Sequence, residues 1–181
     1  TGCATQPGPN DPIVLQPAFP SLPAARLAPL PTAIGVFYTP EFTHGAMTDR
    51  GAPEVTHRPG TASIALFDHV LAAAFEGVVR LSAWPPPAAA AAEDTALVFV
   101  PRIAGVATIR NRPTQTAAGF SGRLIEYGVD VYTSGGDRID SWTLHARSRM
   151  DGAWTPRDDR LYPAAFLDAA AQLLTSILRR P

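Results

Sequence analysis

Residues that could do chemistry gather in one segment, between positions 39 and 60. It holds two of the four histidines, His44 and His57, together with Asp49. Imidazole and carboxylate groups are common zinc ligands and general acids or bases, so a hydrolase or metal site in this segment is one hypothesis. The favoured alternative is a long solvated loop with incidental polar residues, because the segment is rich in glycine and proline.

Arg58 and the residues after it precede a predicted helix, whose free backbone N–H groups favour anions. Helix capping by Thr61 or Ser63 explains this stretch better than a bound anion does. If the segment binds a partner or ligand at its surface, the candidate residues are Phe42, His44, Asp49, His57 and Arg58.

The remaining sequence lacks established catalytic motifs. It contains no His-Glu-x-x-His, Cys-x-x-Cys, Walker or dinucleotide-binding pattern, and Gly119-Phe120-Ser121-Gly122 lacks the spacing of a nucleophile elbow. We therefore expect a non-enzymatic protein without a cofactor or metal. Trp142 and Trp154 could form a platform for a sugar or lipid, although core packing is the favoured interpretation.

Composition indicates a globular protein of one domain with an appendage. The 181 residues are 46% hydrophobic and 17% charged, with a net charge of -1. Without a basic excess to neutralise phosphates, nucleic acid is not an expected partner. There is no run of eighteen apolar residues that would predict a membrane span.

Hydrophobic periodicity predicts an α+β domain over residues 33–181. The expected strands are 33–38, 78–81, 96–106, 124–133 and 138–150, and the expected helices are 61–77 and a C-terminal one opened by Pro163. Pro101 indicates a sheet edge or a bulge. Two helices packed on one face of a mixed sheet of four to five strands is the economical two-layer arrangement.

The two strands joined by the turn 134–137 show the clearest alternation of inward and outward residues. One face of the first strand carries Ile125, Tyr127, Val129 and Val131, and one face of the second carries Trp142, Leu144, Ala146 and Ser148. The turn contains two glycines, which accept positive φ. We expect both apolar faces to lie in the core and His145 to be exposed.

Residues 1–32 form a proline- and alanine-rich tether before the domain. Cys3 is the only cysteine, and Gly2-Cys3 resembles the end of a bacterial lipobox, which implies lipidation of Cys3 and attachment to a membrane. The apolar residues of this arm, beginning with Ile13, Val14 and Leu15, are too numerous for a solvated linker. We expect part of the arm to lie along the domain, as an edge strand.

Four stretches carry a family resemblance: 35–42, 62–67, and the pair 127–132 and 139–142. They resemble the small envelope lipoproteins of the YajG-like group, whose domain is similar to the N-terminal domain of TolB. The resemblance implies an outer-membrane lipoprotein facing the periplasm, with an accessory or scaffold role in envelope assembly or transport. Expected partners are envelope proteins or a second copy. The alternative is a small-molecule, lipid or glycan binder, which requires a pocket between the helices and the sheet.

Overall fold

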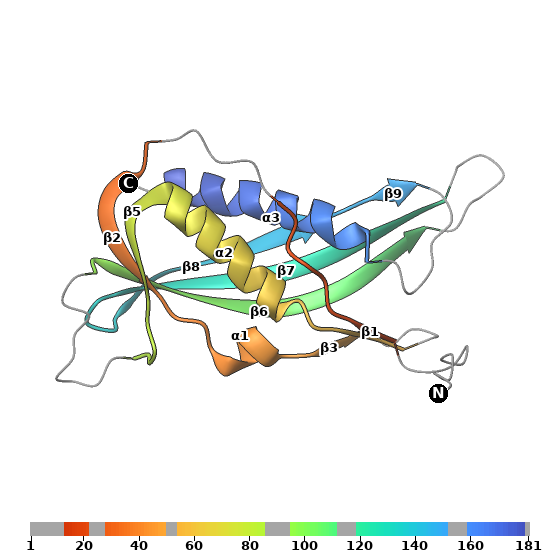
Figure 1. Cartoon of the computed structure of the whole chain (residues 1–181), viewed down its shortest axis with the longest axis horizontal. Helices are drawn as coiled ribbons and strands as arrows, with labels where there is room; N and C mark the ends of the chain where they lie inside the picture. Colours follow the sequence, from red (N-terminus) through yellow and green to blue (C-terminus); the bar gives the residue numbers. More distant parts are fainter. Residues whose placement is uncertain are drawn as a thin grey trace, which may run out of the picture.

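The computed structural model describes residues 13–21, 28–49, 54–85, 95–111, 119–151 and 159–179. These residues form a six-stranded sheet, a three-stranded sheet and three helices, which confirms the predicted α+β class (Figure 1). In chain order the elements are β1 (Ile13–Leu15), β2 (Leu30–Val36), α1 (Pro40–His44), β3 (Met47–Asp49), β4 (Val55–His57), α2 (Gly60–Ala74), β5 (Phe75–Arg80), β6 (Leu97–Asn111), β7 (Phe120–Thr133), β8 (Arg138–Arg147), β9 (Met150–Asp151) and α3 (Leu161–Leu178).

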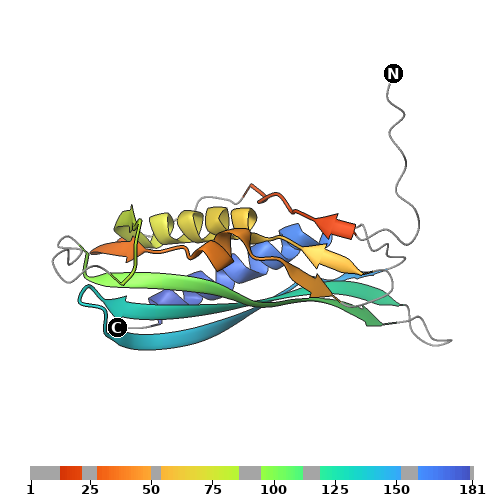
Figure 2. The ribbon, with the colours of Figure 1, turned by 90° about the horizontal axis from the view of Figure 1, so that it is seen from below.

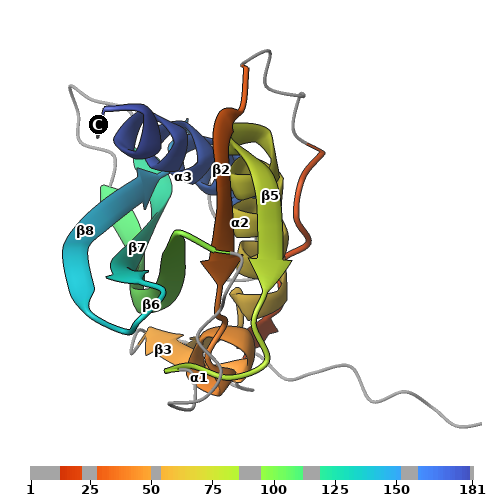
Figure 3. The ribbon, with the colours of Figure 1, turned by 90° about the vertical axis from the view of Figure 1, so that its left-hand side faces the viewer.

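The main sheet has the strand order β5-β2-β6-β7-β8, with the short β9 paired to β7. Strand β2 runs parallel to β5 and β6, whereas β6, β7 and β8 are antiparallel. The sheet curves strongly, so that β2 and β5 stand at an angle to β7 and β8 (Figure 3). The predicted β7–β8 turn is confirmed: Gly136 has a φ of 99°, which favours glycine.

The core lies between the main sheet and the two long helices, which share one side of it (Figure 2). Every second residue of β7 and β8 is buried there, as predicted: Ile125, Tyr127, Val129, Val131, Trp142, Leu144 and Ala146. Helix α3 is long and apolar enough to cross a membrane. Its residues Phe166 and Leu173 are fully buried in this core, as expected of the core helix of a globular domain.

Helix α2 differs from its predicted span at both ends. Gly77 does not end the helix, because the chain turns extended at Phe75 and Gly77 lies within β5 opposite Ala33. At its start α2 has no side-chain cap. Ser63 does not cap it because its hydroxyl is buried and lies 2.9 Å from Tyr127 Oη, so this hydroxyl links the helix to the sheet.

The segment 39–60 is not the long loop that its composition predicts. It contains α1, β3 and β4, and Thr39 Oγ1 caps α1 by accepting from the backbone N–H of Phe42 at 3.1 Å. Strand β4 pairs with β3 and, on its other side, with β1. The prediction that the N-terminal arm adds an edge strand is therefore confirmed (Figure 2).

Two exposed stretches of strand backbone are covered by side chains. Strand β2 pairs with β6 only as far as Phe99. Pro101 of β6 lies just beyond this pairing, so it is at a local edge of the sheet, as predicted. Further along this edge, Asp49 Oδ2 accepts from the backbone N–H of Thr108 at 3.2 Å. On β8, the N–H groups of His145 and Arg147 donate to Gln172 and Asp168 of α3 at 3.0 and 2.7 Å. These contacts close the β8 edge beside α3.

Candidate functional site

An apolar cavity of about 440 Å³ lies at the C-terminal end of α3. It is bounded by the starts of β2 and β5, by β6, by the β7–β8 hairpin and by the last turn of α3. The residues that line it are Leu30, Pro31, Thr32, Phe75, Leu97, Phe99, Val131, Ile139, Asp140, Trp142 and Ile177.

Aromatic side chains form the inner wall of this cavity. The ring of Phe99 lies between those of Phe75 and Trp142, with centroid distances of 5.7 and 6.2 Å. All three side chains are at least nine-tenths buried, whereas Leu30 and Ile139 at the rim are 36% and 56% exposed. The cavity therefore has a buried aromatic interior and an opening to the surface.

A β-bulge shapes one side of the opening. Val131 pairs with Asp140 and Tyr132 pairs with Arg138, so Ile139 is an extra residue on β8. Adjacent residues of a regular strand point to opposite faces, but a bulge redirects one of them. Ile139 and Asp140 consequently both line the cavity. The carboxylate of Asp140 places a negative charge there and accepts from the backbone N–H of Ser141 at 2.7 Å.

The opposite end of α3 is occupied by a polar cluster, which we define as the buried residues His57, Arg123 and Tyr162 together with the half-buried Thr108. Tyr162 Oη lies 2.7 Å from His57 Nδ1, and Arg123 Nη1 lies 3.4 Å from His57 Nε2. Arg123 Nη1 also donates to Thr108 Oγ1 at 2.6 Å. Since arginine only donates, Nε2 accepts and the histidine proton sits on Nδ1, which donates to the tyrosine oxygen.

The electrostatics of the cluster keep His57 neutral. Burial lowers the pKa of His57 to about 4, and the charge of Arg123 acts in the same direction, while Asp49 opposes both. Burial also raises the pKa of Tyr162 above its ordinary value. The guanidinium of Arg123 lies 4.9 Å from the centroid of the Tyr162 ring, which favours the cation. His57, Arg123 and Tyr162 are 0% exposed, so the cluster joins β4, β7 and α3 but is closed to a substrate.

The structure separates the candidates of the 39–60 segment. His44 and Arg58 line a polar cavity of about 120 Å³ at the start of α2, too small for most organic ligands. Asp49 lies against β6, and His57 belongs to the buried cluster. Phe42 is 2% exposed and lies in the core, stacked on Tyr38 at 5.4 Å. Within the described residues, no three histidine, cysteine or acidic side chains are grouped as metal ligands.

The remaining predicted residues have different outcomes. Cys3 and Trp154 lie outside the described residues. Trp142 fills the core, as predicted, and also lines the apolar cavity, while its role as a platform for a sugar or lipid stays a prediction. The cavity was missed in the sequence because its wall comes from distant elements. Arg123 offered a signal for the cluster, since it shares the parity of the buried residues Ile125 and Tyr127.

No protein-family model matches the chain, and no curated protein matches its sequence. Two solved structures superpose on most of it. One is a Helicobacter pylori protein described as a homologue of neuraminyllactose-binding hemagglutinin, with a TM-score of 0.56, 9% identity, and coverage of 90% of this chain and 91% of that chain. The other is a minor lipoprotein from Acinetobacter baumannii, with a TM-score of 0.45, 11% identity, and coverage of 83% and 92%. The first establishes a shared fold alone, and the resemblance to YajG-like lipoproteins stays a prediction.

Proposed function

We propose that this chain is a non-enzymatic lipoprotein of the bacterial envelope that binds the aliphatic part of a small amphiphile in its apolar cavity. The observation that supports binding is the cavity itself. Its volume of about 440 Å³ falls in the range of ligand pockets, roughly 300–1,000 Å³. The anchor at Cys3 rests on the sequence, as does the proposed location on the periplasmic face of the outer membrane.

The lining favours an alkyl or acyl chain over a polar ligand. Phe75, Phe99 and Trp142 offer large apolar surfaces, and each methylene transferred from water to such surroundings gains about 0.8 kcal/mol. Among the described residues that line the cavity, Asp140 alone has an ionisable side chain. Its negative charge disfavours an anionic headgroup, so the proposed ligand carries a neutral, zwitterionic or cationic head.

A glycan fits the cavity less well. The Helicobacter protein is described by its relation to a neuraminyllactose-binding hemagglutinin. Neuraminyllactose is an anionic sugar whose hydroxyls need many hydrogen-bond partners. Among the described lining residues, Thr32, Asp140 and the indole N–H of Trp142 are the polar side-chain groups, which are few for a sugar, and Asp140 repels an anion. A glycan ligand is therefore the weaker version of the binding hypothesis.

An accessory role in an envelope assembly or transport complex is compatible with this cavity. A chain attached to the membrane at Cys3 would hold the domain close to its source of amphiphiles. There the domain would deliver a bound molecule to a protein partner, or report its presence.

Binding can be tested by calorimetric titration of the protein with alkyl phosphocholines of increasing chain length, each below its micellar concentration. We expect the affinity to rise about fourfold with each added methylene until the cavity is full. Alkyl sulfates of equal length should bind more weakly, and neuraminyllactose should not saturate the protein. Absence of saturable binding at every chain length would contradict the proposal.

A matched pair of variants locates the binding site. Val131→Phe places a ring in the cavity and should abolish binding. Val14→Phe makes the same change on β1, where Val14 is 56% exposed and lies outside the cavity, and should leave binding unchanged. Equal affinities of the two variants would show that the amphiphile binds elsewhere.

The anchor is tested separately. The chain is expressed behind a lipoprotein signal peptide in a Gram-negative host, and the membranes are fractionated. We expect the protein with Cys3 in the outer-membrane fraction and the Cys3→Ala variant in the soluble periplasmic fraction. Unchanged membrane fractionation of Cys3→Ala would refute the lipoprotein assignment while leaving the binding proposal intact.

A further inference from the structure

Strand β5 forms the outer edge of the main sheet opposite β8, and no described strand pairs with its outer side. At His145 and Arg147 the β8 edge is covered by side chains of α3, as shown above, whereas backbone groups of β5 point outward. An edge of this kind is a template for pairing with another chain. The question is which chain fits it.

The hydrogen bonds to β2 fix which residues of β5 face outward. The backbone N–H of Leu81 donates to Val36 O at 2.9 Å, so residues with the parity of Leu81 use their backbone groups toward β2. The other parity comprises Glu76, Val78 and Arg80. These three residues direct both N–H and C=O away from the sheet, and in an antiparallel ladder such residues exchange pairs of hydrogen bonds.

The sequence of β5 is complementary to itself in the antiparallel sense. Pairing centred on Val78 places Val78 opposite its own copy and Glu76 opposite Arg80, twice, by symmetry. On the other face, the 47% exposed side chain of Val79 lies opposite Gly77, which has no side chain to obstruct it. Opposite charges at paired positions stabilise a ladder, and like charges there destabilise it.

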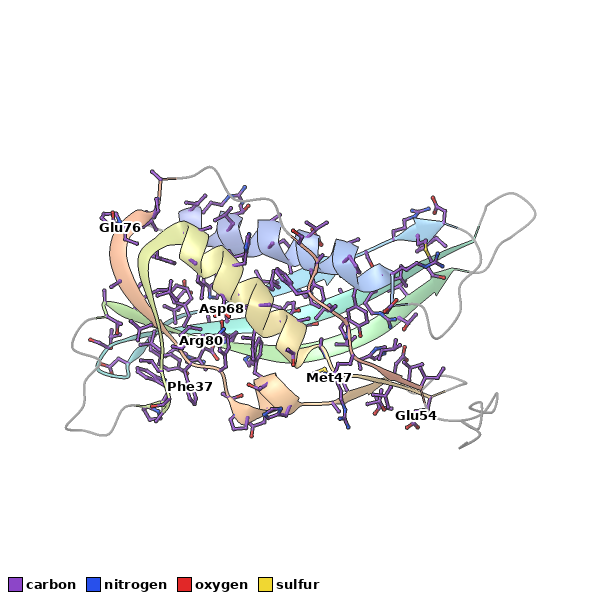
Figure 4. All side chains as sticks on the ribbon, viewed as in Figure 1. Phe37, Met47, Glu54, Asp68, Glu76 and Arg80 are labelled. Carbon is purple, nitrogen blue, oxygen red and sulfur yellow. The ribbon has the colours of Figure 1, made fainter. Side chains whose placement is uncertain are left out.

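The side chain of Arg80 is already oriented for this antiparallel pairing. Arg80 donates through Nε to Asp68 Oδ1 at 3.1 Å and through Nη2 to Asp68 Oδ2, which holds its guanidinium on the helix side of the sheet. Its side chain is still 61% exposed, so a second carboxylate can reach it. Figure 4 shows Glu76 and Arg80 at opposite ends of β5 and Asp68 beside Arg80.

We propose that two copies of this chain associate through antiparallel β5–β5 pairing, with a two-fold axis at Val78 and two Glu76–Arg80 ion pairs across the interface. The occupant of the edge is thus a second copy, because the charges and the outward-facing backbone of β5 match β5 itself. The main sheet continues through both copies. A two-fold interface of this kind closes on itself and leaves no further β5 edge for growth into fibres.

The test exploits the predicted charge pairs. Glu76→Arg and Arg80→Glu are made separately, and each protein is examined by sedimentation velocity and native mass spectrometry over a range of concentrations. We expect the unaltered chain to dimerise. In a dimer of either variant, like charges lie opposite each other at both pairs of positions 76 and 80. The dissociation constant of that dimer should therefore be raised about tenfold or more. A mixture of the two variants restores opposite charges and should form only the heterodimer.

The matched control is Glu41→Arg, which makes the same charge change at an exposed position on α1 and should leave dimerisation unchanged. Arg80→Glu also loses the contact with Asp68, so circular dichroism checks its fold, and Glu76→Arg alone tests the interface if that fold is lost. A monomer at all concentrations, a dimer insensitive to Glu76→Arg, or two folded variants that do not pair would each overturn the proposal. Amphiphile binding is measured separately in each variant, because Glu76 and Arg80 do not line the cavity.

Discussion

The two ends of α3 pack against the same sheet in different ways. At the first end, Tyr162 meets His57 and Arg123 in a polar cluster that is closed to solvent. At the other end, Ile177 borders a cavity that reaches the surface at Ile139. The difference arises from the neighbouring elements, because β4 inserts a side chain beside α3 at the first end, and at the second the β7–β8 bulge opens the wall.

The two ends of α3 are suited to different roles: the polar cluster can hold neighbouring elements in place, and the cavity can hold a ligand. Buried polar groups stabilise a structure only when their hydrogen bonds are satisfied, and then they hold their elements in one arrangement. A cavity does the opposite, because its lining forgoes packing contacts and lowers the stability of the empty protein. We infer that the cluster holds the small sheet in place, and that the cavity is kept open for a ligand.

The largest expected effects come from truncating two side chains of α3, one in the packed core and one at the cavity. Leu173 is fully buried, and Leu173→Ala should lower the free energy of unfolding by about 2–5 kcal/mol. Ile177→Ala, one turn further on, should cost about half as much, because one side of Ile177 already faces the cavity. Urea denaturation measures both values. Equal losses would mean that the cavity end is as tightly packed as the rest.

A second prediction concerns pH and His57. The unfolded chain protonates His57 near pH 6.5, whereas the folded protein does so near pH 4, so unfolding takes up a proton between these values. Stability is therefore fully present above pH 6.5 and should fall by up to about 3 kcal/mol as the pH is lowered to 4.

Variants identify the source of this pH dependence. His57→Gln should flatten the slope of stability against pH between 4 and 6.5. His145→Gln serves as the control, since His145 is exposed on the opposite face of β8. A slope that persists in His57→Gln would assign the pH dependence to other groups. Amphiphile affinity in this window should change little in either variant, because the cavity lies at the far end of α3.

A third prediction isolates one hydrogen bond of the cluster. Tyr162→Phe removes the oxygen that lies 2.7 Å from His57 Nδ1 and leaves a buried donor without its acceptor. The expected loss of stability is about 1–3 kcal/mol. Hydrogen exchange should become faster in β4 and β1 while the affinity for alkyl phosphocholines stays the same. Coupled losses of stability and affinity would show that the two ends of α3 do not act independently.

The sequence allowed much of the main sheet and its two long helices to be predicted, but little of the cavity and the polar cluster. Alternation over the β7–β8 hairpin predicted its buried faces, because each strand has one face on the helices and one in solvent. The segment 39–60 was misjudged because α1, β3 and β4 have five, three and three residues, too few to show a period. Such elements are stabilised by long-range pairing, which local patterns do not contain.

The same limit applies to both ends of α3. His57, Arg123 and Tyr162 come from three distant elements, and Phe75, Phe99 and Trp142 come from three others. An arginine on the apolar parity of β7 does indicate a buried charge with partners, yet it does not say which partners. Cavities leave no trace in a sequence, since they are defined by where side chains fail to meet.

The smallest expected effect concerns the charge at the cavity. Asp140→Asn keeps an oxygen that can accept from Ser141 but removes the negative charge. Screened charges near a surface contribute about 0.2–1 kcal/mol, so the affinity for alkyl sulfates should rise by a factor of about 1.4 to 5, while that for alkyl phosphocholines changes little. Asp137→Asn makes the same change three residues away in the exposed turn and should leave both affinities unaltered. If Asp140→Asn has no effect on the sulfates, the headgroup lies away from Asp140, and the cavity selects its ligand by its apolar walls alone.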